Sequence, residues 1–295
     1  MIFAAIDIGS NAMRLLFCRV YEVDGKPHFS KEELIRMPIR LGEDVFVKGK
    51  ITSSKEERLI TSLKGFSELI KAYQVDDFRA VATSAMRDAS NGAEIIARAR
   101  KESGINVEII DGKLEASLVF SNHTEEIINP KNAYLYIDVG GGSTELTLYY
   151  NQKVIAAKSF NIGTVRMLLN KAEKEEWEEM KAWVKRSAVG IHPLFAIGSG
   201  GNINKIFKMA NKKETKHLSY DKLKELYDML NSYTYEERIE RLGLKPDRAD
   251  VIVPAAKIFL SIMKTADIER VYVPQIGLSD GIVHELYMTK RMNRK

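Results

Sequence analysis

Two aspartates stand at matching places in two similar stretches of the sequence. Residues 4–20 read AAIDIGSNAMRLLFCRV, and residues 135–150 read LYIDVGGGSTELTLYY. In each stretch an apolar strand ends at the aspartate, Asp7 or Asp138, and a turn of small residues follows. Because both aspartates recur in the same context, we expect a functional role for them rather than turn formation alone.

The turns that follow the two aspartates favour phosphate chemistry. Small residues let the backbone approach a ligand closely, and the N–H groups of such a turn can point inward and bind phosphate. In a Rossmann unit the glycine turn opens a helix, but here it opens a second strand. Each stretch is therefore predicted to be a β-hairpin with a phosphate-binding tip. A third small-residue turn, AIGSGGN at 196–202, precedes a helix-like segment.

The rest of the chain supplies strands and helices around these turns. Ser53 and Glu56 are spaced as a capping box ahead of an apolar helical face. Residues 77–91 are interpreted as a strand that runs into a polar loop, and residues 153–163 continue the second sheet. The remaining elements predicted are helices at about 92–102, 172–186, 220–231, 235–242 and 247–264, strands at NVEIID and RVYVP, a turn at QIGLSDG and a final helix.

The composition indicates a folded chain of two domains. The sequence has 295 residues, 45% of them hydrophobic and 29% charged, which is enough to bury a sizeable core. At roughly 150 residues per domain, two domains are expected. The net charge of +5 suits an acidic small or polymeric ligand better than nucleic acid. The single cysteine, Cys18, excludes an internal disulfide and is consistent with a reducing compartment.

Several kinds of site and segment are excluded. No G-x-x-x-x-G-K-[ST] motif occurs, and the histidines are scattered singly, so neither a P-loop nor an H-E-x-x-H metal site is supported. Cys18 lies inside the apolar run MRLLFCRV, which favours a buried strand cysteine over a nucleophile. The N-terminus has no basic region, and the apolar stretch VIVPAAKIFLSIM is too short for a membrane span. The sequence therefore predicts a soluble, cytoplasmic protein.

Six motifs together carry a resemblance to a known family. They are IDIGSN at 6–11 with Arg14 just after it, VATSAMRDASN at 81–91, IDGKLEASLVF at 110–120, IDVGGGSTEL at 137–146, GSGGN at 198–202 and GLSDG at 277–281. In their order and spacing, the chain resembles the exopolyphosphatase / guanosine pentaphosphate phosphohydrolase family from end to end, in its short two-domain form. The resemblance implies an α/β fold of two actin-like ATPase (ribonuclease H-like) domains with an active-site cleft between them.

The boundary between the domains is expected at a polar segment. HTEEIINPKN, residues 123–132, is polar and broken by Pro130, just before the second aspartate stretch. We therefore expect an N-terminal domain at 1–125 and a C-terminal domain at 126–280. The final helix, residues 281–295, is expected to pack back on the first domain.

The resemblance also implies roles for individual residues. Glu115 matches the family's catalytic carboxylate, which activates the attacking water, and Arg87 matches the basic residue that grips the phosphate chain. Asp138 and Glu145 match acidic residues that hold or orient Mg²⁺, and Asp7 could bind metal at the matching place. The implied substrate- and phosphate-binding positions are Ser10, Asn11, Arg14, Gly140, Gly141, Gly142, Ser143, Gly200, Gly201 and Asn202.

This sequence departs from the family's pattern at three places. Ala12 stands where many members have Ser or Thr, and Asn202 stands where Thr is frequent. The segment GKLEAS, residues 112–117, replaces a more acidic one that often ends in Arg. None of these changes removes a chemical role, but one hydroxyl contact is lost at Ala12.

Simpler interpretations stay open for several of these residues. Glu115 taken alone is an exposed glutamate one turn beyond a strand, and Arg87 is a solvated loop arginine. Glu145 taken alone is an outward-facing strand residue. Arg14 could form a structural ion pair. Core packing at helical spacing explains the stripe of Trp177, Met180, Trp183 and Val184.

The function implied by the resemblance is that of an exopolyphosphatase. Such an enzyme removes terminal phosphate from inorganic polyphosphate by Mg²⁺-assisted attack of a carboxylate-activated water. A guanosine pentaphosphate 5′-phosphohydrolase is the alternative, and an actin-fold kinase and a non-catalytic polyphosphate sensor are weaker ones. Polyphosphate is favoured because we assign no aromatic and polar cluster to a guanine. The expected partners are therefore polyphosphate or guanosine pentaphosphate, without nucleic acid or membrane, and a homodimer stays open.

Overall fold

The computed structural model describes residues 1–121, 129, 132–151, 153–210 and 217–292. Two units make up the chain: Met1–Asn122 together with Leu278–Lys295, and His123–Gly277. The chain therefore leaves the first unit, builds the second and returns to the first with its last helix. The hinge segment and the boundary expected between residues 125 and 126 lie outside the described residues, apart from residues 129 and 132.

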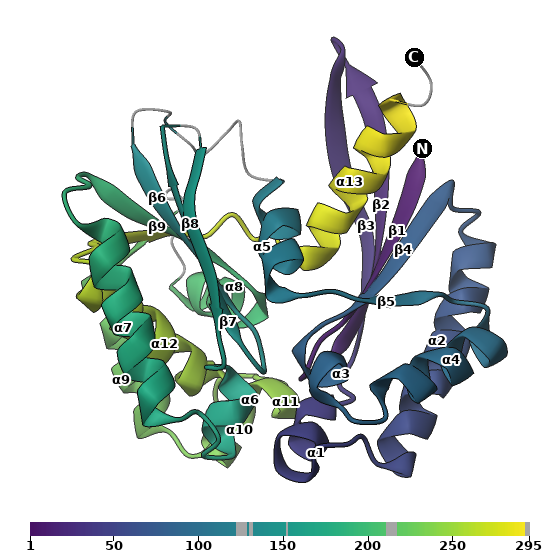
Figure 1. Cartoon of the computed structure of the whole chain (residues 1–295), viewed down its shortest axis with the longest axis horizontal. Coiled ribbons are helices and arrows are strands. Elements are labelled where there is room, and N and C mark those ends of the chain that lie inside the picture. The colour runs from purple at the N-terminus through teal and green to yellow at the C-terminus, as the bar shows by residue number, and fades with distance from the viewer. Residues whose placement is uncertain (122–128, 130–131, 152, 211–216, 293–295) are drawn as a thin grey trace. The chain divides into compact units, whose positions relative to one another are not determined.

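A five-stranded mixed sheet is the framework of the first unit (Figure 1). Its strands are β1 (Ile2–Ile8), β2 (Met13–Val23), β3 (Lys26–Met37), β4 (Asp77–Ala82) and β5 (Val107–Ile109), in the order β3-β2-β1-β4-β5. β1, β2 and β3 are antiparallel neighbours because short turns join them. β4 and β5 run parallel to β1, because helical crossovers connect them.

A six-stranded mixed sheet in the second unit repeats this topology. Its strands are β6 (Ala133–Val139), β7 (Thr144–Tyr150), β8 (Lys153–Phe160), β9 (Leu194–Ser199), β10 (His217–Ser219) and β11 (Arg270–Tyr272), in the order β10-β11-β9-β6-β7-β8. β6, β7 and β8 are antiparallel neighbours, and β9 and β11 run parallel to β6. The two sheets confirm the α/β class and the two related units that the resemblance implies.

The same backbone turn closes both predicted hairpins. The Gly9 N–H donates to the Ala12 carbonyl at 3.1 Å, and the Gly140 N–H donates to the Ser143 carbonyl at 2.9 Å. Each turn therefore joins two antiparallel strands at matching places in the internal repeat. The prediction of two hairpins with small-residue tips is confirmed.

The last helix of the chain belongs to the first unit, alongside its sheet. Figure 1 shows it in yellow next to β1 and β2, which it contacts together with β4. Its residues Ile282 and Tyr287 share a buried cluster with Phe3 of β1 and Leu16 of β2. The helices in the described part of this unit are α1 (Leu41–Lys48), α2 (Ser53–Ala72), α3 (Ser84–Asp88), α4 (Gly92–Ser103), α5 (Gly112–Ser121) and α13 (Leu278–Met292).

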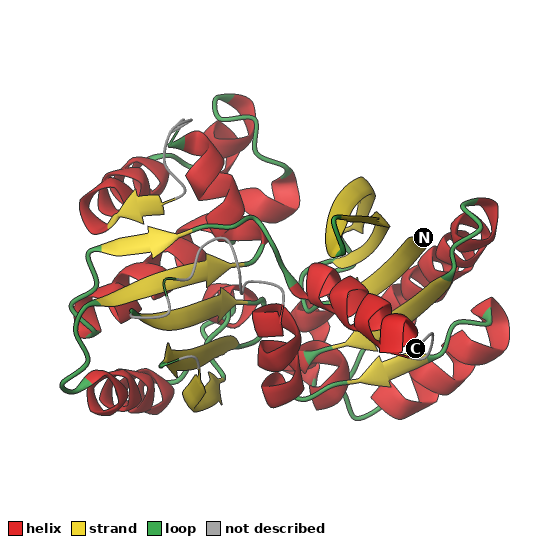
Figure 2. Cartoon of the chain, turned by 90° about the horizontal axis from the view of Figure 1, so that it is seen from above, coloured by secondary structure: helices red, strands yellow, loops and turns green. Residues whose placement is uncertain are grey.

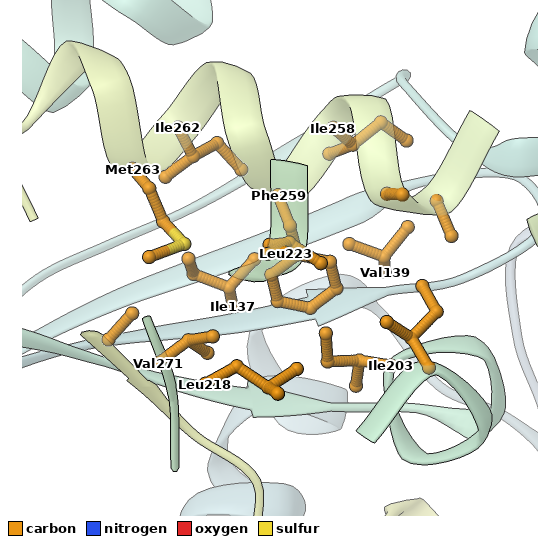
Figure 3. Packing of buried hydrophobic residues seen from close by; sticks show 14 of the residues in the cluster. Ile137, Val139, Ile203, Leu218, Leu223, Ile258, Phe259, Ile262, Met263 and Val271 are labelled. Carbon is orange, nitrogen blue, oxygen red and sulfur yellow. The ribbon is translucent and has the colours of Figure 1, made fainter. Parts of the chain in front are cut away.

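The helices of the second unit lie around its sheet (Figure 2). Buried apolar side chains of the helices and strands form the core of this unit. They are, among the described residues, α6 (Thr164–Leu168), α7 (Lys174–Ala188), α8 (Gly201–Met209), α9 (Tyr220–Ser232), α10 (Tyr235–Glu240), α11 (Pro246–Ala249) and α12 (Ile252–Thr265). Phe259 of α12 packs among Ile137, Val139 and Ile203, which come from β6 and α8 (Figure 3). A Cβ at Gly198 of β9 would lie 2.9 Å from the Phe259 ring, so this glycine makes room for the ring.

The predicted stripe of large apolar residues on α7 is confirmed as core packing. Met180 and Val184 are fully buried in the core of the second unit, and Trp177 and Trp183 pack against it. Among the described helices, none is both long and apolar enough to cross a membrane.

The single helix predicted at 247–264 is wrong, because two helices occupy this segment. α11 ends at Ala249, and α12 begins at Ile252. Pro254 has no N–H group, and its ring would clash with the carbonyl four residues earlier in a continuous helix. The chain therefore restarts the helix so that Pro254 lies in its first turn, where the N–H group would have no helical partner.

The capping box predicted at Ser53 and Glu56 is also wrong. α2 already begins at Ser53, and the N-cap residue Thr52 makes no side-chain cap hydrogen bond. Its hydroxyl donates instead to Oδ2 of Asp44 at 2.5 Å. A tertiary contact therefore takes the place of the local one.

Two segments expected as loops or turns are helical. Residues 84–88 of the expected polar loop form α3, so Arg87 lies on a helix. The turn expected at QIGLSDG ends early, because α13 begins at Leu278 and includes Gly281. In both segments the helix packs against neighbouring elements, which a local pattern of small and polar residues does not reveal.

Candidate active site

The first tip, residues 9–12, is held by its carbonyl groups. The Ser10 carbonyl accepts from the Gly42 N–H at 2.8 Å, and the Asn11 carbonyl accepts from the Arg40 N–H at 2.9 Å, both at the start of α1. The Ser10 hydroxyl lies 2.8 Å from the hydroxyl of Ser84, the first residue of α3. The Ser10 and Asn11 carbonyl groups of the tip therefore point toward α1 and not toward a ligand. Such an arrangement suits a tip whose N–H groups meet an anion.

Asp7 at the end of β1 is neutralised by Arg14, its cross-strand neighbour. Nη1 of Arg14 donates to Oδ2 of Asp7 at 2.6 Å, and the side chains are 31% and 4% exposed, respectively. The ion-pair interpretation of Arg14 is therefore confirmed. Because a guanidinium already balances this carboxylate, Asp7 is poorly suited to hold Mg²⁺. The exposed part of Arg14 has further N–H groups that can donate to a phosphate.

The second tip, residues 140–143, is held in the same manner. The Gly141 carbonyl accepts from the Val165 N–H at 2.8 Å, and the Gly142 carbonyl accepts from Nε of Arg166 at 2.7 Å. Gly163 packs so closely on this tip that a Cβ would lie 2.4 Å from the Gly141 carbonyl oxygen. The start of α6 therefore supports the second tip as the start of α1 supports the first.

Asp138 and Glu145 form an acidic pair across β6 and β7. They are directly opposite in the antiparallel register, where Cβ atoms lie about 5 Å apart. Glu145 is 3% exposed, and its Oε1 accepts from the Ser159 hydroxyl of β8 at 2.8 Å. Like charges in this arrangement destabilise a sheet, and a bound cation removes the repulsion. The matching positions in the first unit, Asp7 and Arg14, carry opposite charges and need no added cation.

The third turn meets the acidic pair at Gly200. β9 runs parallel to β6, and Ser199 at its end is the register partner of Asp138. Gly200 has a φ of 102°, and a Cβ there would lie 3.2 Å from Oδ1 of Asp138. The backbone conformation therefore favours glycine, and the space for a side chain is tight. Gly201 and Asn202 begin α8 beside this carboxylate, where the N–H groups of a helix N-terminus favour an anion.

The acidic pair fits Mg²⁺ better than it fits a metal held in a full protein cage. Within the described ranges, no group of three or more His, Cys, Asp or Glu side chains could hold a metal ion. Mg²⁺ keeps several waters and is usually bound by one or two carboxylates together with substrate phosphates. Asp138 and Glu145 supply two carboxylates, and the adjacent glycine turns are suited to the phosphates.

Arg87 and Glu115 lie close to the same end of β5 in the first unit. Nη1 of Arg87 donates to the Ile110 carbonyl at 2.9 Å, directly after β5. Asp111 follows and caps α5, with Oδ1 accepting from the Leu114 N–H at 2.7 Å. Glu115 lies in the first turn of α5 and is 9% exposed. The interpretations of Arg87 as a solvated loop residue and of Glu115 as an exposed carboxylate are therefore wrong, because Arg87 lies on α3 and bonds to the Ile110 carbonyl and Glu115 is buried.

The predicted site residues divide between the two units. The first unit contains the predicted base, the gripping arginine and the first tip: Asp7, Ser10, Asn11, Arg14, Arg87 and Glu115. The second contains the acidic pair and the two remaining turns: Asp138, Gly140, Gly141, Gly142, Ser143, Glu145, Gly200, Gly201 and Asn202.

Sequence reasoning missed the groups that hold the tips in place. Arg40 and Gly42 follow β3 in the first unit, and Gly163 and Arg166 follow β8 in the second. A signal for them is present, because a glycine follows the third strand of each repeat. The internal repeat therefore extends beyond the hairpins that revealed it.

Comparison with known proteins decides the relationship that the motifs indicate. The model of the Ppx/GppA phosphatase family matches residues 24–290. The chain belongs to this family. The resemblance based on six motifs is thereby confirmed.

Relatives in the Ppx/GppA family carry more than one activity in their names. The chain is 31% identical to the bifunctional 3-dehydroquinate synthase/phosphatase of Fusobacterium nucleatum, over 88% of this chain and 43% of that protein. It is 25% identical to exopolyphosphatase 1 of Mycobacterium tuberculosis, over 96% of this chain and 87% of that protein. It is 26% identical to the guanosine-5'-triphosphate,3'-diphosphate pyrophosphatase of Aeromonas salmonicida, over 97% of this chain and 59% of that protein. The chain thus spans less than half of the Fusobacterium protein.

Solved structures of Ppx/GppA proteins share the fold along the whole chain. An exopolyphosphatase from Cytophaga hutchinsonii matches with a TM-score of 0.84 and 25% identity, over 97% of both chains. The Ppx/GppA family member of Aquifex aeolicus matches with a TM-score of 0.76 and 26% identity, over 98% of both chains. These relatives therefore share the α/β fold of this chain.

Proposed function

We propose that this family member is an exopolyphosphatase, which hydrolyses terminal phosphate from inorganic polyphosphate with the help of Mg²⁺. The observation that carries the proposal is the acidic pair of Asp138 and Glu145 beside two glycine turns. A cation bound by these carboxylates would attract phosphate oxygens bound at the turns. The exopolyphosphatase relative, of which the chain spans 87%, supports the same substrate.

The first unit would supply the groups that act on phosphate and water. Arg14 and Arg87 would donate to phosphate oxygens, because guanidinium groups match their geometry. The Glu115 carboxylate would take a proton from water as the water oxygen bonds to the terminal phosphorus. The bond from that phosphorus to the bridging oxygen would break, and the bridging oxygen would leave with the electron pair.

The second unit would hold the phosphate chain and the cation. Asp138 and Glu145 would bind Mg²⁺, which when present lowers the negative charge that builds up on the phosphate oxygens. The tips at residues 140–143 and 200–202 would orient the chain through backbone N–H groups. The reaction further requires groups from both units.

Guanosine pentaphosphate is the second candidate substrate. It is supported by the Aeromonas relative, whose name describes a pyrophosphatase for this nucleotide. The chain spans 59% of that protein but 87% of the Mycobacterium exopolyphosphatase, so the relative that it covers more fully favours polyphosphate. Both substrates end in the same phosphoanhydride, so the reaction at the cleaved bond is the same for both.

Phosphate release from purified protein tests the proposal. Polyphosphate, guanosine pentaphosphate and ATP are compared at matched concentrations of terminal phosphate, with Mg²⁺ and with EDTA. We expect Mg²⁺-dependent release, with the highest kcat/KM for polyphosphate. A higher kcat/KM for guanosine pentaphosphate would reverse the order of the two substrates. Binding of polyphosphate without release from any of the three would indicate a sensor instead.

A further inference from the structure

Gly281 lies where α13 crosses the backbone of α5. A Cβ built at this position would be 2.0 Å from the Leu118 carbonyl oxygen and 3.2 Å from the Val119 N atom. Real Cβ atoms essentially never approach another atom closer than 3.0 Å, so only a hydrogen atom fits. The glycine of the GLSDG motif therefore sets how closely the two helices pack.

α5 is fixed on both sides of its first two turns. Leu118 and Val119 are buried in a cluster with Ile282, the residue next to Gly281. At the other end of the helix, Asp111 caps the first turn, and its carbonyl accepts from the Glu115 N–H at 3.0 Å. The crossing and the cap together leave the first turn little freedom to shift.

Glu115 lies between the cap and the crossing. Leu118 and Val119 follow it by three and four residues, so all three share one face of α5. A helix moves nearly as a rigid body over so short a distance, so a displacement at the crossing carries the Glu115 carboxylate with it. A shift of α5 at its contact with Gly281 would therefore also shift the carboxylate of the proposed base.

We infer that Gly281 is a positioning residue, which sets the place of the Glu115 carboxylate by fixing the separation of α13 and α5. The inference rests on the role proposed for Glu115. A methyl group at residue 281 would have to retreat by about 1 Å or more to reach an allowed contact with the Leu118 carbonyl, and a misplacement of about 1 Å can cost about 100-fold in rate. If Gly281 had only a structural role, its substitution would change stability but not the turnover of the folded protein.

Gly281→Ala is the main test, and kcat is measured separately from KM. Ile282→Val is the matched control, because it removes one methylene from the same cluster and adds no atom at the crossing. Gly65→Ala on α2 is a second control, since a Cβ there meets nothing within 4 Å. Each variant is assayed for polyphosphate hydrolysis with saturating Mg²⁺ and for urea unfolding.

We expect Gly281→Ala to lower kcat by about 10- to 100-fold and to leave KM within about twofold. Ile282→Val should lose stability and keep its kcat, whereas Gly65→Ala should keep its kcat and become slightly more stable, because alanine favours a helix interior over glycine. If folded Gly281→Ala retains a kcat within twofold of Ile282→Val, the positioning role is refuted. Where Gly281→Ala does not fold, Leu118→Val serves instead, because it loosens α5 at the same crossing. The inference then requires that Leu118→Val has a lower kcat than Ile282→Val. An equal kcat in the two variants overturns the inference.

Glu115→Gln in the same series separates this inference from the proposed function. An inactive Glu115→Gln together with a fully active Gly281→Ala overturns the positioning role alone. A fully active Glu115→Gln overturns the proposed base, and the link from Gly281 to that base falls with it. Loss of kcat in both variants supports both statements.

Discussion

Neutralising one member of each cross-strand pair should change stability in opposite directions. Glu145→Gln removes one of two like charges on β6 and β7, whereas Arg14→Gln removes the cation beside Asp7. The two positions match in the internal repeat, so the surrounding backbone is similar. In Glu145→Gln the amide oxygen can still accept from the Ser159 hydroxyl, so this hydrogen bond is kept.

The expected magnitudes follow from the charges and their burial. Two unit charges about 5 Å apart repel by about 0.8 kcal/mol in water and by about 3 kcal/mol at an effective dielectric constant of 20. Because Glu145 is buried and Asp138 is half-buried, we expect Glu145→Gln to raise the free energy of unfolding by about 1–3 kcal/mol in EDTA. Removing one partner from a buried pair costs about 3–5 kcal/mol. Since Arg14 is 31% exposed, we expect Arg14→Gln to lower stability by about 1–3 kcal/mol.

Urea unfolding with EDTA and with Mg²⁺ measures both effects. At 100 times its Kd, a bound cation stabilises the folded protein by about 2.7 kcal/mol, and Glu145→Gln should lose most of this increase. Arg14→Gln should keep it, because the acidic pair is unchanged. A Glu145→Gln protein that is less stable than wild type in EDTA and still gains stability from Mg²⁺ would refute the reasoning.

Three further outcomes concern the base, the gripping arginine and the cysteine. Glu115→Gln should lower kcat by about 10²–10⁴ with little change in KM, measured by steady-state phosphate release, and a folded variant with near-normal kcat would exclude the base. Arg87→Ala should raise KM for long chains and flatten its dependence on salt. Arg87→Ala should also lower kcat, because Arg87 donates to the Ile110 carbonyl just before α5, which carries the proposed base. An effect on KM alone would show that this hydrogen bond does not contribute to turnover. Burial raises the pKa of the Cys18 thiol to about 12, so a disulfide-exchange reagent at pH 8 should react only as fast as the protein unfolds; immediate reaction would contradict the burial.

Local patterns in the sequence were sufficient to predict the architecture. Alternating apolar residues around a turn of small residues specify a hairpin, whatever the rest of the chain does. The repetition of this pattern around Asp7 and Asp138 therefore predicted two related units. The helix predicted at about 235–242 begins at Tyr235 with a capping box of Thr234 and Glu237, whose hydrogen bonds join residues within one turn.

Predictions from local patterns were wrong where a segment distant in sequence contacts the same residues. Ser53 and Glu56 have the spacing of a capping box, but Thr52 bonds to Asp44 instead. Arg87 lies in a polar stretch, but packing on neighbouring elements makes that stretch helical. In each place, a contact between residues far apart in sequence replaced the local one that the pattern indicated.

The sequence by itself determined the two hairpins, their glycine tips and the acidic residues at the ends of their strands, because these depend on neighbours along the chain. Only the tertiary structure showed that Arg14 forms an ion pair with Asp7. The strand register pairs Asp7 with Arg14 but Asp138 with Glu145, and a register is set by the packing of whole strands. The close contact of Gly281 with α5 was likewise invisible in the sequence. Separate parts of the chain meet there, and the space left for a side chain exists only once both are folded.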